Sequence, residues 1–256
     1  NEIETYYEPF IGGGAVFFRL AHNRINLKAK LSDTNGDLIN GYLTIQNHVN
    51  DLINSLESLS KKYFSSHDKE KFFYKMRDSY NSSKDKLERT TYMIFLNKTC
   101  FNGLYRVNRS GEFNVPYGDY KKPKILDKEN LLAINTLVNE LDVDFQALDY
   151  EKALESSTQN DFCYLDPPYQ PEQEGGFTSY TKDSFNEENQ LRLSKLITKL
   201  GTQHTNVMLS NSATQYIRKL YQKSTYKISE FPTLRSINSD AKNRKGSTEL
   251  IIMNYS

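Results

Sequence analysis

The chain of 256 residues is long enough for one large domain or for a main domain with an insertion. Its hydrophobic content of 37% and charged content of 25% are typical of soluble globular proteins. No apolar run reaches the roughly 18 residues that indicate a membrane span, and no signal peptide is visible, so a cytoplasmic protein is expected. The net charge of +1 argues against a globally basic nucleic-acid binder but leaves local basic patches open.

The N-terminus and the cysteines add two further expectations. The sequence begins at Asn1 instead of methionine and reaches a glycine-rich turn within a dozen residues, so we expect an N-terminal segment to be missing from it. Cys100 and Cys163 lack the spacing of metal ligands and are expected to be reduced thiols.

The first fifth of the chain predicts two consecutive strand–helix units. The predicted segments are a strand over residues 6–11, a turn at Gly12–Gly14, a helix over 15–22, a strand over 28–32 that ends at Asp33, and a helix over 37–47. A glycine turn therefore joins the first strand to the first helix, and an acid follows the second strand.

The middle of the chain has a different character. Residues 50–134 contain helical stretches rich in Lys, Tyr and Phe, followed by the turn sequence Asn-Arg-Ser-Gly-Glu. That turn lies between residues 105–107 and 112–115 and predicts a β-hairpin. The segment 84–124 has nine Lys or Arg residues against four acids, which makes it +5 and the rest of the chain −4.

After Leu141 the alternation of strands and helices returns. Strands are predicted at 143–145, 162–165, 206–209, 226–230 and 249–254, and helices at 187–200 and 213–221. The fold class is therefore α/β, a doubly wound sheet of the Rossmann type interrupted by a mainly helical subdomain that carries the hairpin. The expected boundaries are 1–50 with 135–256 for the main domain and 51–134 for the insertion. The polar stretch 236–247 is predicted to be a loop.

An unusual turn, Asp-Pro-Pro-Tyr, follows the apolar strand at 162–165. Open α/β sheets bind ligands at the carboxyl ends of their strands, which is where Asp166 is expected. Pro167 and Pro168 lack backbone N–H groups and have fixed φ, so they hold Asp166 and Tyr169 on one stiff turn. Taken alone, the same residues also fit a strand-terminating turn with a solvated acid.

Three other strand ends suit an adenosine ligand. The loop Gly12–Gly14 allows close approach to the backbone, and Asp33 can accept two hydrogen bonds from a ribose. A dinucleotide fingerprint needs a third glycine where this chain has Phe17, which argues against a nicotinamide dehydrogenase. Asp144 and Phe145 could contact an adenine amino group and ring, although a purely structural glycine turn and a core Phe explain the same residues.

The ordered motifs EPFIGGGAVFF, SDTNGDLIN, NKTCFNGLYRVNRSGEFNVPYGDYKKPK, DF, DPPY and VMLSNS resemble the Dam-type DNA adenine-N6 methyltransferases, the D12 class in its alpha group. The resemblance covers nearly the whole chain. It implies a methyltransferase sheet with an inserted DNA-recognition subdomain, S-adenosyl-L-methionine as methyl donor, no metal, double-stranded DNA as partner, no membrane and no obligate protein partner. It also implies a bacterial or phage origin.

For catalysis, the resemblance implies the turn Asp166, Pro167, Pro168 and Tyr169. The lone pair of an adenine amino group is delocalised into the ring, so Asp166 and the Pro167 carbonyl would accept its hydrogens and make the nitrogen nucleophilic. Tyr169 would stack on the flipped base. For the cofactor, the implied residues are Glu8, Pro9, Phe10, Gly12, Gly13, Gly14, Asp33, Asp144, Phe145 and Asp166.

For DNA, the resemblance implies a GATC-like site. Arg106 would read a guanine, Leu104 and Pro116 would contact thymine methyl groups, and Phe101 would fill the place of the flipped adenine. The other implied contacts, mostly to phosphates or flanking DNA, are Lys98, Asn102, Asn108, Tyr120, Lys121, Lys122 and Arg244.

Several alternatives stay open. A related methyltransferase could act on RNA or on a protein amide, although the basic insertion argues against it. A non-catalytic DNA-binding relative also fits, because the Lys-Trp-x-Gly-Gly-Lys-like motif that the family has before its first strand is not in the sequence. Cytosine-C5 methylation is disfavoured because Thr99 and Phe162, not prolines, precede the two cysteines. The biological role, whether restriction–modification, mismatch repair or phage, is not determined by the sequence.

Overall fold

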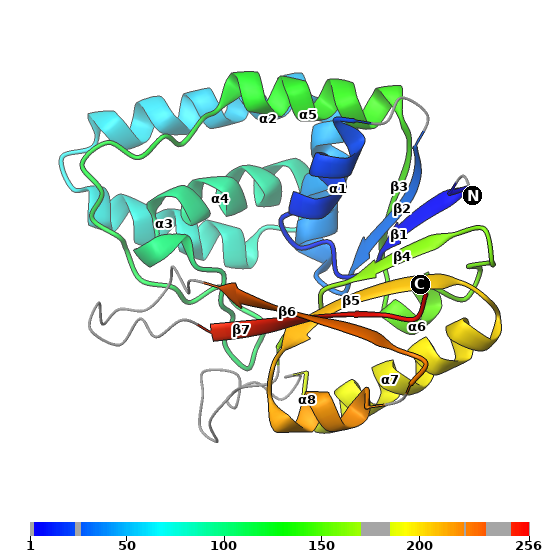
Figure 1. Ribbon diagram of the computed structural model, residues 1–256. Coiled ribbons are helices and arrows are strands. Elements are labelled where there is room, and N and C mark those ends of the chain that lie inside the picture. Colours follow the sequence, from blue (N-terminus) through cyan, green and yellow to red (C-terminus); the bar gives the residue numbers. More distant parts are fainter. Residues whose placement is uncertain (1–2, 24–26, 170–184, 223, 234–246, 256) are drawn as a thin grey trace. The chain divides into compact units, whose positions relative to one another are not determined.

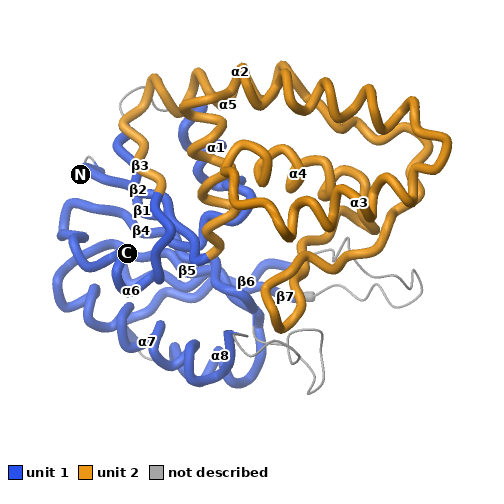
Figure 2. Tube along the Cα trace, turned by 180° about the vertical axis from the view of Figure 1, so that it is seen from behind, with its two compact units in different colours: residues 1–34, 146–256 blue, residues 35–145 orange. Residues whose placement is uncertain are grey.

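A computed structural model describes residues 3–23, 27–169, 185–222, 224–233 and 247–255. The chain divides into two compact units: residues 1–34 with 146–256 form the first, and residues 35–145 form the second (Figure 2). The predicted insertion, 51–134, lies within the second unit.

The first unit is built on a β-sheet. Its strands are β1 (Thr5–Glu8), β2 (Lys28–Asp33), β4 (Phe162–Leu165), β5 (Asn206–Ser212), β6 (Lys227–Thr233) and β7 (Ser247–Met253), and its helices are α1 (Ala15–Ala21), α6 (Tyr150–Ala153), α7 (Glu187–Thr202) and α8 (Gln215–Leu220). β3 (Asp142–Ala147) ends in this unit. Across the described residues the seven strands have the order β3-β2-β1-β4-β5-β7-β6. α1 lies on one face of the sheet, and α7 and α8 lie on the other (Figure 1).

Parallel pairing brings the carboxyl ends of the central strands to one edge of the sheet. β1 pairs in parallel with both β2 and β4, and β4 pairs in parallel with β5. Parallel strands run in the same direction, so their carboxyl ends meet at the same edge. The residues at or just after those ends are Glu8, Asp33 and Asp166.

The central strands are held by apolar burial on both faces. All four residues of β1 are buried, as are the last three of β4. One core cluster joins Cys163 and Leu165 of β4 to Leu209 of β5 and to Leu193 and Ile197 of α7. Buried parallel strands are expected to be almost continuously apolar, which explains why the short run at 162–165 was recognisable in the sequence.

The second unit is mainly helical in its described residues. It contains α2 (Gly36–Ser65), α3 (Lys69–Ser82), α4 (Lys86–Thr99), a short 3₁₀ helix η1 (Phe101–Gly103) and α5 (Lys128–Glu140). Each α-helix begins at an Asn or Asp whose side chain accepts a backbone N–H of the first turn; these caps are Asn35, Asp68, Asp85 and Asp127. A separate apolar core, which includes Leu52, Leu56, Phe73 and Phe95, packs these helices together.

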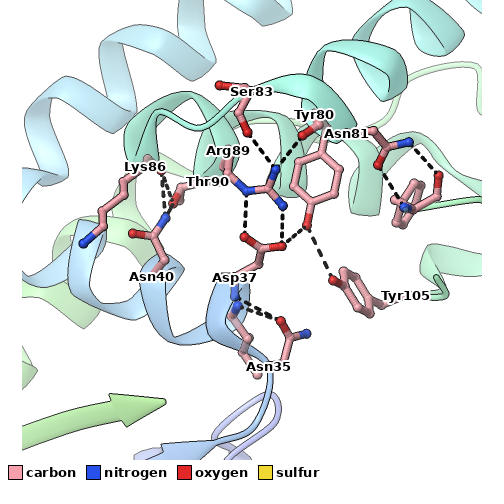
Figure 3. Close-up of polar contacts among 12 residues, drawn as sticks. Asn35, Asp37, Asn40, Tyr80, Asn81, Ser83, Lys86, Arg89, Thr90 and Tyr105 are labelled. Atoms are coloured by element: carbon pink, nitrogen blue, oxygen red, sulfur yellow. Dashed lines mark hydrogen bonds and ion pairs between the residues drawn. The ribbon is translucent and has the colours of Figure 1, made fainter. Parts of the chain in front are cut away.

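An ion pair between Asp37 and Arg89 joins three helices of this unit (Figure 3). The Arg89 guanidinium donates from Nε and Nη2 to the Asp37 carboxylate at 2.8 and 2.6 Å, and from Nη1 to the carbonyls of Tyr80 and Ser83 at 2.8 and 2.9 Å. The Tyr80 hydroxyl donates to the same carboxylate at 2.9 Å. These bonds, those from Arg89 first, lower the pKa of Asp37. They fix the start of α2 against the end of α3 and the first turn of α4.

Most predicted elements are confirmed, with two corrections. The first strand ends at Glu8 and not at Ile11, because Pro9 has no N–H to continue the ladder. The predicted hairpin contains no named strands; it has one isolated bridge between Val107 and Phe113. Pro116 cannot donate a hydrogen bond, which limits further pairing. The predicted loop at 236–247 lies outside the described residues except at its last position.

Candidate active site

The Asp-Pro-Pro-Tyr turn leaves the carboxyl end of β4 and is anchored on neighbouring strands. The Tyr169 hydroxyl forms a hydrogen bond of 2.6 Å with Ser210 Oγ of β5 and donates a longer one, 3.5 Å, to Glu249 Oε2 of β7. Pro167 is buried, whereas Asp166 and Pro168 are exposed and Tyr169 is partly exposed. The turn therefore presents a carboxylate and a phenol ring whose hydroxyl end is fixed.

The Asp166 carboxyl has an altered acidity. Its surface is open to solvent, but protein atoms around the carboxyl remove part of its hydration and raise its pKa, and the charge of Glu249 adds to this effect. A hydrogen bond with Tyr169 acts in the opposite direction. A raised pKa makes Asp166 a stronger base than an ordinary aspartate while leaving it able to accept hydrogen bonds.

Glu8, at the end of the adjacent strand β1, is a buried carboxyl with 2% exposure. Tyr6 donates its hydroxyl to Glu8 Oε2 at 2.6 Å. Burial raises the pKa of Glu8 from 4.5 to about 7; the bond from Tyr6 opposes the rise and the negative charge of Asp166 adds to it. Two carboxyls with raised pKa values thus lie at neighbouring strand ends, a combination that is common at functional sites.

The glycine loop is tied to the end of β2. Gly12 and Gly14 have φ angles of 46° and 69°, in the left-handed region that glycine adopts without strain. The N–H of Gly12 donates to Asp33 Oδ2 at 3.2 Å, and the N–H of Ile11 donates to the Ser32 carbonyl at 3.0 Å. A Cβ atom built on Gly13 would meet nothing within 4 Å. The backbone here is both fixed and open to a ligand.

Aromatic rings surround Phe10, which lies two residues before this loop. Pro9 is buried, and the Phe10 ring lies 5.4 Å from Tyr150 in a stacked arrangement and 5.8 Å from Phe185 edge-on. The predicted residues from Glu8 to Gly14, Asp33 and the Asp166–Tyr169 turn all lie at the carboxyl edge of the first unit. Asp144 and Phe145 belong to the second unit, where the Phe145 ring stacks on Tyr42 at 4.9 Å.

The residues predicted to contact DNA lie in the second unit, apart from Arg244, which is outside the described residues. Leu104 and Asn108 are half-buried. The others are exposed: Lys98, Phe101, Asn102, Arg106, Pro116, Tyr120, Lys121 and Lys122. Exposed apolar rings are unusual in such number, and Phe101, Tyr105 and Tyr120 are 46%, 43% and 39% exposed.

Local hydrogen bonds shape this exposed segment. Arg106 donates from Nε to Asn114 Oδ1 at 2.7 Å and from Nη2 to the Asn114 carbonyl at 3.2 Å. The N–H of Asn102 donates to the Tyr120 hydroxyl at 3.0 Å. Asn81 of α3 pairs through its side-chain amide with both the N–H and the carbonyl of Phe113, at 2.9 and 3.1 Å (Figure 3). The loop that carries Arg106 is therefore fastened to a helix.

Sequence reasoning missed the side chains that support the Asp166–Tyr169 turn. Ser210 and Asn211 lie in the VMLSNS motif, which by itself gives them no role. Glu249 begins a predicted strand, and Gln190 of α7 belongs to no recognisable motif. Only the fold brings these four side chains to the turn, so no pattern local to any one of them could have indicated it.

Among the described residues, no group of three or more His, Cys, Asp or Glu side chains is arranged to hold a metal ion. Burial raises the pKa of the Cys100 and Cys163 thiols, so neither is prepared as a thiolate nucleophile. No helix in the described part of the chain is long and apolar enough to cross a membrane.

Comparison with known proteins gives a consistent result. The family model described as "D12 class N6 adenine-specific DNA methyltransferase" matches residues 1–237. The type II methyltransferase M.MjaIII of Methanocaldococcus jannaschii is 43% identical over 266 residues, covering 100% of this chain and 90% of its own. The type II methyltransferase M1.LlaDCHI of Lactococcus lactis subsp. cremoris is 36% identical, covering 98% and 86%. The DNA adenine methylase of Escherichia coli K12 is 31% identical, also covering 98% and 86%.

The buried Glu8 carboxyl predicts a specific dependence of stability on pH. Its pKa is raised in the folded protein, so the unfolded chain releases this proton first, and the free energy of unfolding falls as pH rises from 4.5 to about 7. At about 1.4 kcal/mol per pKa unit, the loss is roughly 3 kcal/mol. Glu8→Gln keeps an acceptor for Tyr6 and removes the titration. We expect denaturant midpoints of parent and variant to be closest at or below pH 4.5. The variant should become increasingly more stable than the parent up to about pH 7, with a constant difference above that pH.

Glu188→Gln, at an exposed position of α7, serves as the matched control, and its midpoints are expected to follow those of the parent. If the Glu8→Gln and parent curves stay parallel between pH 4.5 and 8, Glu8 does not titrate as described.

Proposed function

Because the chain belongs to the family of D12 class N6 adenine-specific DNA methyltransferases, we propose that it transfers the methyl group of S-adenosyl-L-methionine to the amino group of a flipped adenine in double-stranded DNA. The observation that carries this proposal is the Asp166–Tyr169 turn at the carboxyl edge of the sheet, next to the fixed and open glycine loop. Relatives named as DNA adenine methylases support the choice of acceptor.

The residues of the first unit fit the methyl donor. The open backbone at Gly13 and the Asp33 carboxylate suit its methionine and ribose parts, with Glu8, Pro9 and Phe10 beside them. Asp144 and Phe145 are the proposed contacts of its adenine ring. When bound, it supplies an electrophilic methyl group on a sulfonium.

The turn supplies the other half of the chemistry. The lone pair of the target nitrogen is delocalised into the adenine ring, and acceptors for its two hydrogens make the nitrogen more pyramidal. Asp166 and the Pro167 carbonyl are the proposed acceptors. The nitrogen then gains the methyl group as the bond from that carbon to the sulfonium sulfur breaks, which leaves S-adenosyl-L-homocysteine. The nitrogen also loses one proton, which Asp166 can take because its pKa is raised. Catalysis rests on positioning and on preorganised electrostatics, without a covalent enzyme intermediate.

Tyr169 is proposed to stack on the flipped base. Its hydroxyl is held by Ser210, so the ring is oriented before the base arrives. Stacking on an aromatic ring contributes about 1–3 kcal/mol, which helps offset the few kcal/mol needed to unstack and unpair a base.

The exposed residues of the second unit are proposed to recognise duplex DNA at a GATC site. The segment 84–124 is basic, with a charge of +5 from nine Lys or Arg and four acids. Arg106 is the proposed reader of guanine, with Leu104 and Pro116 against thymine methyl groups and Phe101 in the place of the flipped base. The basic and polar residues Lys98, Asn102, Asn108, Tyr120, Lys121 and Lys122 would contact the backbone or the outer bases.

Removal of the catalytic carboxylate tests the reaction. With radiolabelled S-adenosyl-L-methionine and short duplexes, we expect label on the adenine of 5′-GATC-3′ and little on one-base variants. Asp166→Ala should lower the rate by at least about 100-fold, the usual cost of losing one preorganised polar group. Asp78→Ala, at an exposed position of α3, is the matched control and should leave the rate unchanged. Label on no DNA at all would refute the proposed reaction, and label on other adenines would refute only the site.

Replacement of the proposed guanine reader tests recognition. Arg106→Ala should reduce discrimination between GATC and its guanine variants by about 1–3 kcal/mol, or roughly 5- to 150-fold in kcat/KM ratios. Arg109→Ala, an exposed arginine in the same loop, removes an equal charge and should weaken binding without changing the ratio. Equal loss of discrimination in both variants would mean that Arg106 acts only as a positive charge.

A further inference from the structure

A buried glutamine contacts the catalytic turn from inside the first unit. Gln190 lies in the first part of α7 and has 0% exposure. Its Nε2 donates a hydrogen bond of 3.1 Å to the Pro168 carbonyl. Burying an amide is costly unless its hydrogen-bonding groups are satisfied, so a glutamine at an otherwise apolar position of a helix requires a reason.

Its partner is a second buried amide. Asn211 of β5 also has 0% exposure, and its Nδ2 donates to Gln190 Oε1 at 2.9 Å. Asn211 Oδ1 in turn accepts the backbone N–H of Ser212 at 2.8 Å. The result is a chain of three hydrogen bonds that runs from the backbone of β5 through two side chains to the backbone of the turn.

The direction of this chain is fixed at both ends. The Ser212 N–H can only donate and the Pro168 carbonyl can only accept, so each amide has one orientation that satisfies all three bonds. Rotation of either amide by 180° would place like groups against each other. The chain therefore acts as a rigid connection in which every polar group is paired.

The turn has particular need of such a connection. Pro167 and Pro168 have no N–H with which to fasten themselves to the sheet. Two adjacent residues of β5 hold the turn instead: Ser210 through the Tyr169 hydroxyl, and Asn211 through Gln190 and the Pro168 carbonyl. The two anchors enclose Pro168, and the fixed φ angles of the prolines transmit their position to the Pro167 carbonyl and to Asp166.

We propose that Gln190, oriented by Asn211, is a positioning residue for methyl transfer, which holds the Asp166–Tyr169 turn so that Asp166 and the Pro167 carbonyl meet the target amino group. The inference rests on the proposed function and adds to it two residues that do not touch the substrate. A small displacement of reacting groups is sufficient to lower a rate by about 100-fold, so the effect belongs in kcat.

Gln190→Glu is a nearly isosteric test of this role. An ionised Glu at this position would face the Pro168 carbonyl with an oxygen instead of an N–H, whereas the protonated form could donate in place of the amide. We expect kcat at pH 8 to fall by about 10- to 100-fold, with KM for S-adenosyl-L-methionine within about twofold of the parent. At pH 6 the rate relative to the parent should recover by at least about tenfold, because a protonated Glu restores the hydrogen-bond donor.

Dividing the rate of the variant by that of the parent at each pH cancels pH effects that both share. These include effects of the ionisable groups beside the turn, which are Asp166, Glu249 and Tyr169. Gln215→Glu, at an exposed position of α8, adds the same charge and should show the pH profile of the parent. A Gln190→Glu profile that parallels the parent would overturn the inference.

Gln190→Met is a second variant that tests the same role even if Gln190→Glu does not fold. It removes both hydrogen bonds without a charge, and the inference predicts a fall of about tenfold or more in kcat with KM for S-adenosyl-L-methionine unchanged. An unchanged kcat, or an equal loss of cofactor binding, would overturn it. A parent that methylates DNA while the Gln190 variants are unaffected contradicts this inference alone, whereas a parent that methylates no DNA contradicts the proposed function.

Discussion

The absence of backbone N–H groups at Pro167 and Pro168 is the constraint on which the site depends. It stops β4 at Leu165 and leaves the two central residues of the turn without backbone donors. The turn is held by side chains from β5, β7 and α7, and these can reach it only because β4 pairs in parallel with β5 and β7 pairs with β5. The geometry of the turn therefore depends on the topology of the sheet.

Two carboxyls at this edge of the sheet are less stable in their ionised form than ordinary carboxylates. Glu8 and Asp166 both have raised pKa values because burial and neighbouring negative charge disfavour ionisation. A purely structural site would place cations beside them. The second unit does so for Asp37, whose carboxylate is paired with Arg89 and has a lowered pKa. Within one chain, the carboxylate with a lowered pKa joins the helices of the second unit. The carboxyls with raised pKa values lie in the candidate active site.

The sequence predicted what depends on local pattern and missed what depends on packing. The apolar run of β4, the acid after β2 and the glycine turn before α1 were legible because strand burial and turn conformation restrict residue types directly. The role of Gln190 could not be predicted from the sequence, because a polar residue on a helix ordinarily indicates a solvated face. The predicted hairpin contains a single bridge, between Val107 and Phe113. The backbone N–H and carbonyl of Phe113 are hydrogen-bonded to the side chain of Asn81, which is distant in sequence. The stacking of the Phe145 ring on Tyr42 is likewise a contact that no local sequence pattern indicates.

The central claim is that the Asp166–Tyr169 turn receives the target adenine at the edge of the sheet where the glycine loop holds the methyl donor. A crystal structure of the protein with a non-reactive analogue of S-adenosyl-L-methionine and a GATC duplex tests it most directly. The account predicts a flipped adenine with its amino nitrogen within hydrogen-bond distance of Asp166 and the Pro167 carbonyl, and its ring on Tyr169. An adenine left stacked in the duplex, or bound away from this turn while the analogue occupies the glycine loop, would contradict it.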